Sequence, residues 1–244
     1  MKLLVLMGGN RVLDSTNGYP LYLTEIKGRV ILEVLLEKYR TAGFSEELFC
    51  VKQAEMDSFN VDSIIKSLSN KAIIVTVNEV TKGAVCTALL ASEFIDTEES
   101  LLIVSVDDYI DCDINNILSV FVKKNLDCGL VNFTSVHPRY SFICRDENGQ
   151  ICEITEKKPV STQALATFLY FKKGSDFVDC AKNVIRKDNR VNDAFYLSQC
   201  INEMLLKQKK VESVQVDNRF FHSFKTERQL ASYLSAISNE KASV

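Results

Sequence analysis

The strongest chemical signal in the chain is a pair of carboxylates, Asp107-Asp108, directly after the apolar run from Leu101 to Val106. An apolar run of this length is typical of a strand buried on both faces of a parallel sheet. Carboxylate oxygens are ligands that Mg²⁺ prefers, and bound Mg²⁺ commonly bridges to substrate phosphates. We therefore predict a metal site at Asp107 and Asp108. The alternative is a capping or turn pair without a ligand.

A second candidate site lies near the N-terminus, where Gly8-Gly9 follows the apolar run from Leu3 to Leu6. Two glycines after a buried strand allow positive φ and expose main-chain N–H groups to an anion such as phosphate. Asn10 and Arg11 stand at the mouth of this loop. On these residues alone, a simple tight turn is an equal interpretation. Ligands gather beyond the carboxyl ends of parallel strands, so we expect this loop and Asp107-Asp108 at one sheet edge.

A third candidate is the segment Glu156-Lys157-Lys158-Pro159, which ends another predicted strand. Its lysines could bind a phosphate and its carboxylate could bind hydroxyl groups, although a lysine-rich turn is commonly only solvated. The two histidines, His137 and His222, are far apart in the sequence, and we expect ordinary surface or core residues. The spacing supports no Cys/His or Ser/His/Asp arrangement for nucleophilic catalysis.

The composition narrows the class of protein. The chain has 244 residues, enough for one large α/β domain, and its net charge of −3 argues against nucleic-acid binding. No apolar stretch is long enough to span a membrane and no signal peptide is expected, so we predict a cytoplasmic protein without membrane contacts. None of the eight cysteines lies in a C-x-x-C pair and most lie in apolar runs. They are predicted to be buried, reduced thiols; a zinc site or disulfides are the alternative.

The elements that must position these residues alternate between apolar strands and amphipathic helices in the first half. Strands are expected at 3–6, 47–51, 72–77 and 101–106, and helices at 30–39, 61–68, 82–94 and 113–123, with Asp113 as an N-cap. Such alternation is typical of a parallel sheet with helices on both faces.

From Leu130 the pattern changes to four short strands in succession, with a hairpin signal at Asn148-Gly149. The strands are expected at 130–136, 141–145, 151–155 and 165–171. They are followed by helices at 176–186 and 193–206, a strand at 211–216, a helix at 227–237 and a frayed tail from Ser238. We predict one α/β domain, 1–244, with a mixed, mainly parallel sheet.

Taken together, these segments resemble the sugar-phosphate nucleotidylyltransferase family, whose members join a nucleoside triphosphate to a phosphorylated small molecule and release pyrophosphate. Asp193 to Asn202 is similar to a helix found in members from capsule and surface-polysaccharide pathways. The other similar segments, in family order, are Leu6 to Arg11, Pro20 to Val30, Thr81 to Ala84, Val104 to Asp107, Glu156-Lys157, Leu169 to Phe171 and Thr226 to Leu230.

The chain departs from the family at three places. Its glycine loop is shorter and lacks a second spaced glycine, and Leu21 stands where the family has a phosphate-binding lysine. Phe221-His-Ser-Phe224 replaces a segment that carries a second metal-binding Asp in many members. Either Lys27, Arg29 or Lys82 substitutes for the missing lysine, or the protein has lost efficient turnover.

The resemblance implies a Rossmann-like nucleotide-diphospho-sugar transferase fold, with a nucleotide-binding half at 1–128 and an acceptor-binding half at 129–244. It implies an in-line attack by an acceptor phosphate on the α-phosphorus of the nucleotide. The implied catalytic residues are Asp107, which holds Mg²⁺, Arg11, which meets the β- and γ-phosphates, and Lys157, which grips the acceptor phosphate. Further residues are implied for the nucleotide (Gly8, Gly9, Asn10, Lys82, Gly83), for the acceptor (Glu156, Asp193) and for the metal (Asp108, with Asp193 in reserve).

Two other functions remain open from the sequence. A glycosyltransferase of related fold would use Asp107-Asp108 for the metal that holds a nucleotide-diphospho-sugar, but it leaves the Gly-Gly-Asn-Arg opening unexplained. A non-catalytic descendant that binds nucleotide or a partner protein is favoured by Leu21. The resemblance favours a pyrimidine nucleotide and a role in surface-glycan precursors, and scattered apolar residues would allow a homodimer.

Overall fold

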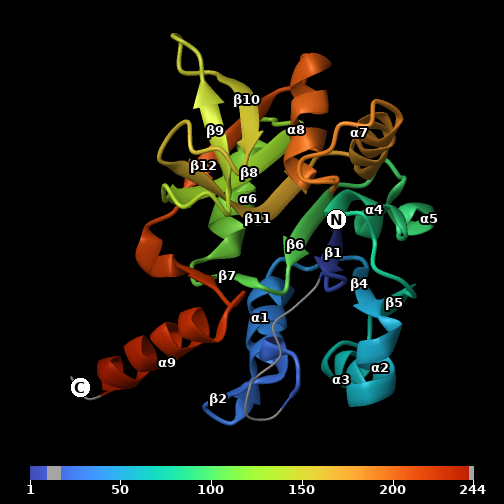
Figure 1. The fold of residues 1–244 in the computed structure, drawn as a ribbon, viewed down its shortest axis with the longest axis vertical. Coiled ribbons are helices and arrows are strands. Elements are labelled where there is room, and N and C mark those ends of the chain that lie inside the picture. The colour runs from blue at the N-terminus through green and yellow to red at the C-terminus, as the bar shows by residue number, and fades with distance from the viewer. Residues whose placement is uncertain (10–17, 242–244) are drawn as a thin grey trace.

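A mixed sheet is the centre of the fold in the computed structural model, which describes residues 1–9 and 18–241. In this part of the chain the sheet has nine strands, ordered β10-β9-β11-β6-β1-β4-β5, and β8 extends it from β11 to β12 (Figure 1). Its parallel part is formed by β1 (Lys2–Leu6), β4 (Glu47–Lys52), β5 (Ala72–Val77) and β6 (Leu101–Ser105). The predicted α/β fold class is therefore confirmed.

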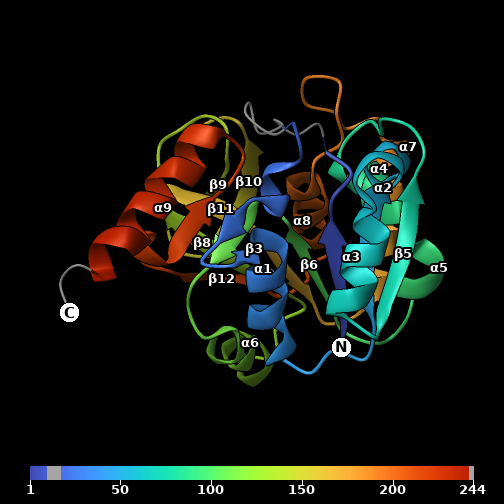
Figure 2. The same ribbon diagram turned by 90° about the horizontal axis from the view of Figure 1, so that it is seen from below.

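Helices cover both faces of the sheet, as Figure 2 shows. One face is packed by α1 (Ile31–Arg40), α2 (Gln53–Phe59), α3 (Val61–Leu68) and α6 (Ile114–Lys123), and the other by α4 (Ala84–Leu89), α5 (Ser92–Ile95), α7 (Gly174–Arg186) and α8 (Leu197–Leu206). In β1, Leu4 and Leu6 belong to one core and Leu3 and Val5 to the other. Successive side chains of a strand point to opposite faces, so an all-apolar strand fills both cores.

The second half adds antiparallel strands to the same sheet. They are β8 (Cys128–Thr134), β9 (Ser141–Arg145), β10 (Ile151–Glu156) and β11 (Gln163–Phe171), followed by β12 (Val211–Gln215), which is parallel to β8. The two halves meet where β11 pairs antiparallel with β6. The predicted hairpin at Asn148-Gly149 joins β9 to β10, with Gly149 at a φ of 77°. One continuous sheet therefore carries both halves.

The C-terminal segment returns to the carboxyl end of β6. There β7 (Asp108–Ile110) pairs with β13 (Phe221–Ser223), which follows the short helix η2 (Asn218–Phe220). The last helix, α9 (Glu227–Lys241), leaves the sheet beside α1 (Figure 1). A third core cluster joins α9 to β7, α1, η1 (Leu21–Leu23) and the small hairpin of β2 (Glu25–Ile26) and β3 (Arg29–Val30). This return brings residues 220–226 next to Asp107.

Several boundaries differ from the sequence prediction. The helix predicted at 82–94 is two helices, α4 and α5, and the helix predicted at 193–206 begins only at Leu197. Asn192 and Asp193 have positive φ, which an α-helix does not contain. The tail predicted from Ser238 is wrong in its start, because α9 continues to Lys241. The helix α2 and the β7–β13 ribbon were not predicted.

All eight cysteines are free thiols, but only four of them are fully buried. Cys152 is exposed, so the prediction of buried thiols is wrong for this residue. Its strand, β10, lies at the end of the sheet order, and Cys152 and Glu153 are consecutive exposed positions where the pairing with β9 shifts register. Within the described residues, no helix has the length and apolar character needed to cross a membrane.

Candidate functional site

A cavity of about 620 Å³ lies at the carboxyl ends of β1 and β6. Residues from both halves of the chain line it, which places the predicted site residues of the two halves in one space. The predicted residues that line it are Gly8, Gly9, Gly83, Asp107, Glu156 and Lys157. Asn10 and Arg11 lie outside the described residues.

Gly8 is required by the close approach of α4 to the loop after β1. A Cβ at Gly8 would lie 2.8 Å from Cγ2 of Thr87, which is nearly fully buried in α4. Thr87 is itself fixed, since its hydroxyl lies 2.6 Å from that of Thr81. Both Gly8 and Thr81 line the cavity. The first glycine therefore lets the strand end pack against α4, and Gly9, with no atom near its Cβ position, leaves open space on the cavity side.

Gly83 allows the loop before α4 to cross the loop before α8. Its φ is 112°, and an added Cβ would lie 2.4 Å from the carbonyl oxygen of Phe195. Phe195 N–H donates to the carbonyl of Lys82 at 2.8 Å, and the N–H of Val85 donates to the carbonyl of Phe195 at 3.2 Å. Only glycine fits such a backbone contact at this φ. The crossing joins a cavity wall from the first half to one from the second half.

Asp107 is held at the end of β6 by its own backbone. Its N–H donates to Oγ of Ser105 at 3.2 Å, and that hydroxyl lies 3.3 Å from Oδ2 of Asp107. The carbonyl of Asp107 accepts the N–H of Phe224 at 2.7 Å. The carboxylate therefore lines the cavity from a backbone that is fixed on both sides.

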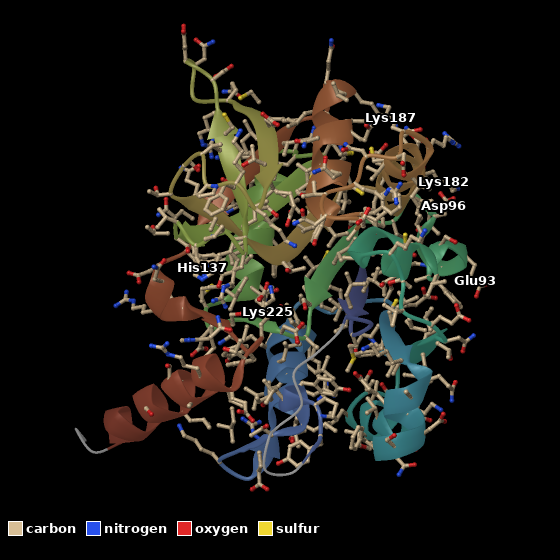
Figure 3. All side chains as sticks on the ribbon, viewed as in Figure 1. Glu93, Asp96, His137, Lys182, Lys187 and Lys225 are labelled. Atoms are coloured by element: carbon tan, nitrogen blue, oxygen red, sulfur yellow. The ribbon has the colours of Figure 1, made fainter. Side chains whose placement is uncertain are left out.

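Asp108 is turned into the protein, and only 2% of its surface is exposed. Its Oδ2 accepts the N–H of Thr167 at 3.0 Å, and its Oδ1 lies 3.3 Å from Nζ of Lys225. Burial alone lowers the pKa of the Lys225 ammonium, but the carboxylates of Asp108 and Asp107 raise it, and the pKa lies above its ordinary value. Figure 3 shows Lys225 where the C-terminal segment passes the sheet, and its side chain lines the cavity.

These contacts test whether the carboxylates fit a Mg²⁺ ion. Asp108 does not line the cavity, and its oxygens already face an N–H group and an ammonium, so the paired site that the sequence predicts is not formed. No group of three or more potential metal-ligating side chains occurs among the residues that the structure describes. Asp107 still fits, because Mg²⁺ can be held by one carboxylate together with substrate phosphates and water.

Glu156 and Lys157 line the cavity from the end of β10, in the second half of the chain. Oε2 of Glu156 accepts the hydroxyls of Ser141 at 2.5 Å and Ser198 at 2.8 Å, which fix the carboxylate at the end of β10. Nζ of Lys157 donates to the hydroxyl of Tyr196 at 2.5 Å and lies 4.6 Å from the centre of that ring. This wall can bind a phosphate through the ammonium and hydroxyl groups through the carboxylate.

Two other predicted residues are not part of the cavity wall. Lys82 and Asp193 lie beside residues that line it, but neither lines it itself. The Asp193 side chain is 99% exposed, and one of its carboxylate oxygens lies 4.0 Å from the guanidinium of Arg190. Among the proposed substitutes for the lysine absent at Leu21, Arg29 pairs with Glu37 at 2.5 Å, and neither Lys27 nor Arg29 lines the cavity.

Sequence reasoning missed several residues of the cavity. Tyr196 and Ser198 lie inside the segment from Asp193 to Asn202 that resembles the family, but their spacing in the sequence does not show that they contact the Glu156-Lys157 turn. Lys225 directly follows the segment Phe221 to Phe224, where the chain departs from the family. The positive charge of Lys225 directly after this segment is the one feature of the sequence that indicates a role in the site.

The chain is similar to a known protein family. A family model described as nucleotidyl transferase matches residues 2–220 of the chain. Among curated proteins, none matches it by sequence.

Solved structures share the fold at low sequence identity. A nucleoside-diphosphate-sugar pyrophosphorylase from Vibrio cholerae is 17% identical, with a TM-score of 0.77 over 96% of this chain and 100% of that one. A candidate glucose-1-phosphate thymidylyltransferase from Bacillus anthracis, solved with sucrose, is 15% identical, with a TM-score of 0.78 over 96% and 94%. A UDP-glucose pyrophosphorylase complexed with UDP-glucose is 16% identical, with a TM-score of 0.75 over 98% of each chain.

At such identities the structures show the common fold, while the family model shows the family. The match covers most of the chain, and its residues include the glycine loop, Asp107 and the Glu156-Lys157 wall. The chain belongs to the nucleotidyl transferase family and is a nucleotidyltransferase.

Proposed function

We propose that the protein transfers a nucleotidyl group from a nucleoside triphosphate to a phosphorylated sugar or another small phosphate, with release of pyrophosphate. The observation that carries this proposal is the single cavity that joins Gly8, Gly9 and Asp107 on one wall to Glu156 and Lys157 on the other. One wall offers main-chain N–H groups and a carboxylate, and the other offers a cation beside hydroxyl-binding groups. A donor and an acceptor can therefore lie face to face.

The transfer needs no general base, since the attacking phosphate oxygen is already an anion. The protein aligns the two substrates and balances their charge. Lys157, oriented by Tyr196, binds the acceptor phosphate, and Glu156, fixed by Ser141 and Ser198, binds hydroxyl groups of a sugar. Gly8 and Gly9 let the nucleotide approach the backbone, and Arg11 is assigned to the β- and γ-phosphates. Asp107 would hold Mg²⁺, which when bound supplies charge neutralisation on the leaving pyrophosphate.

The nucleotide and the pathway are proposals at a finer level. A pyrimidine nucleotide is supported by the described activities of two structural neighbours, a thymidylyltransferase candidate and a UDP-glucose pyrophosphorylase. A role in surface-glycan precursors is supported by the similarity of Asp193 to Asn202 to capsule-type members. We also propose one domain with a nucleotide-binding half and an acceptor-binding half, a cytoplasmic location and a homodimer.

The first experiment is a thermal-shift panel with CTP, UTP, dTTP, ATP and GTP, each with and without Mg²⁺. A ligand at about 100 times its Kd stabilises the folded protein by about 2.7 kcal/mol. We expect one pyrimidine triphosphate to raise the Tm, and the same nucleotide to be released as a triphosphate when pyrophosphate is added to its sugar conjugate. A shift with nucleotide-diphospho-sugars alone would instead support a glycosyltransferase.

The matched variant for this experiment is Asp107→Ala, with Asp62→Asn on α3 as the control. Asp107 lines the cavity, whereas Asp62 pairs with Lys66 within its own helix. Loss of a charged group that stabilises the transition state lowers turnover by about 100- to 1,000-fold. We expect that loss for Asp107→Ala, with Asp62→Asn close to wild type. Full activity of Asp107→Ala would contradict the assigned site.

A further inference from the structure

Lys225 is a cation that lies beside the carboxylate pair Asp107-Asp108 at the end of β6. Among the described residues, the lysines and arginines that line the cavity are Arg139, Lys157 and Lys225. Lys157 contacts Tyr196, on the acceptor wall, and the guanidinium of Arg139 contacts the ring nitrogens of His137 at 3.1 and 3.2 Å. Lys225 differs from both, since its nearest charged partner belongs to the strand end that carries Asp107.

The fold itself brings Lys225 to this place. Ser223 is opposite Asp108 in the β13–β7 ribbon, and the N–H of Phe224 donates to the carbonyl of Asp107 at 2.7 Å. The next residue along the chain is therefore delivered to the edge of the cavity, next to the loop after β1. The β1–β6 pairing sets Leu6 opposite Ser105, so Gly8 and Asp107 follow neighbouring strand ends.

The charges at this edge explain why a cation is needed. Asp107 and Asp108 are consecutive carboxylates at the wall that is assigned to a triphosphate, and like charges repel. Asp108 is buried, and its Oδ1 has no well-aligned hydrogen bond, so the ammonium 3.3 Å away is its compensating charge. The Lys225 side chain is 37% exposed. An ammonium has three N–H donors, so the group that compensates Asp108 can also donate to a ligand in the cavity.

We propose that Lys225 is a nucleotide-binding residue, a built-in cation that contacts the phosphates of the bound triphosphate beside Asp107. A nucleoside triphosphate then binds without a divalent ion, whatever ion the transfer step uses. The proposal rests on the proposed function, and it names the residue that supplies the positive charge absent at Leu21. That charge comes from the C-terminal segment, far from Leu21 in the sequence.

The test uses the triphosphate that gives the largest Tm shift in the panel above. Isothermal titration calorimetry measures its Kd, once in EDTA and once in Mg²⁺. A hydrogen bond to a charged group is worth about 1.5–3 kcal/mol, or about 10- to 100-fold in Kd. We expect wild type to bind in EDTA within about threefold of its Kd in Mg²⁺. Lys225→Met should weaken binding in EDTA by at least about 10-fold, whereas Lys225→Arg, which keeps the charge, should lose less.

The control is Lys182→Met, because Lys182 pairs with Asp96 and both lie near α5 and α7, away from Lys225 in Figure 3. It should bind as wild type does. Lys225→Met leaves Asp108 as an uncompensated buried charge, which can unfold a protein. The double variant Asp108→Asn, Lys225→Met removes both charges, and we expect it to fold and still to lose binding in EDTA.

Two results would overturn the inference while leaving the proposed function intact. The first is a ratio of the Kd in EDTA to the Kd in Mg²⁺ that is as large for wild type as for the variants. The second is a Kd in EDTA that is the same for the folded double variant as for wild type. If no triphosphate binds wild type with or without Mg²⁺, the proposed function fails and the inference fails with it.

Discussion

At the level of single residues, the proposed acceptor wall, formed by Glu156 and Lys157, contains one lysine whose ammonium contacts a tyrosine. Lys157→Met removes the ammonium, while the backbone N–H of Lys157, which donates to the carbonyl of Tyr140 at 3.0 Å, still holds the turn. A charged hydrogen bond to a phosphate contributes about 1.5–3 kcal/mol, so we expect the KM for the acceptor to rise by about 10- to 100-fold. The Kd of the nucleotide should stay the same, since Lys157 lies on the other wall. Steady-state kinetics and calorimetry check these two values.

The partner variant Tyr196→Phe separates orientation from charge. It removes the hydroxyl that Lys157 contacts but keeps the ring, whose centre lies 4.6 Å from the ammonium. We expect a smaller rise in the acceptor KM, of about 5- to 10-fold, because the ammonium stays and loses only the hydroxyl that orients it. An equal loss for both variants would mean that the tyrosine, not the lysine, binds the acceptor.

Single residues of the site could be predicted from the sequence where a motif is continuous. Asp107 follows a buried strand, and Glu156-Lys157 ends one, so their place at the sheet edge follows from the pattern. Lys225 could not be placed in this way, because its position depends on the β13–β7 pairing over a long sequence separation. The same reason hides the partner of Asp108, whose burial makes it a poor metal ligand.

At the level of elements, the crossing at Gly83 is a local contact on which the shape of the cavity depends. Gly83→Ala would set a Cβ 2.4 Å from the carbonyl oxygen of Phe195, at a φ of 112°. We expect the free energy of unfolding to fall by more than about 2 kcal/mol, since backbone strain and a clash act together. Urea denaturation measures this loss. The catalytic rate should fall as well, because both loops line the cavity.

The control for this change is Gly149→Ala in the β9–β10 hairpin. Gly149 also has a positive φ, of 77°, but no atom lies within 4 Å of its Cβ position. Only the conformational cost remains there, about 1 kcal/mol. Equal losses for the two variants would show that the contact with Phe195 contributes nothing.

Elements with a regular apolar pattern were predictable, and those fixed by contacts were not. The ranges of α3 and β5 match the prediction, because short amphipathic and β-branched runs carry their own signal. The helix predicted from Asp193 begins at Leu197 because the backbone of Phe195 is bound to the loop before α4. Hydrogen bonds of this kind, between distant loops, leave no periodicity in the sequence.

At the level of the whole molecule, the buried thiols make stability depend on alkaline pH. Burial raises the pKa of Cys50 from 9.0 to about 12 and that of Cys180 to about 11. Above pH 9 the unfolded chain loses these protons and the folded chain keeps them. Their contribution to stability is therefore complete below pH 9 and falls as the pH rises toward the raised values.

We expect each such thiol to lower the free energy of unfolding by about 1 kcal/mol between pH 8 and pH 10. Urea unfolding under reducing conditions at these two pH values measures the change. Cys50→Ala leaves a small void in the core, so its free energy of unfolding is lower at both pH values. The decrease between pH 8 and pH 10 should nevertheless be smaller than in wild type by about 1 kcal/mol, the contribution of one thiol. An unchanged fall would mean that Cys50 is accessible to water in the folded protein.

We expect the backbone crossing of Gly83 and Phe195 to couple the binding of the two substrates as well. A nucleotide that orders the loop before α4 must order the loop before α8, since the carbonyl of Phe195 and the N–H of Val85 are bonded to each other. Coupling of this kind is reciprocal, so an acceptor analogue should raise the affinity for the nucleotide by the same factor by which the nucleotide raises the affinity for the analogue. Cooperation between donor and acceptor would then reside in a few atoms of main chain, which neither ligand has to touch.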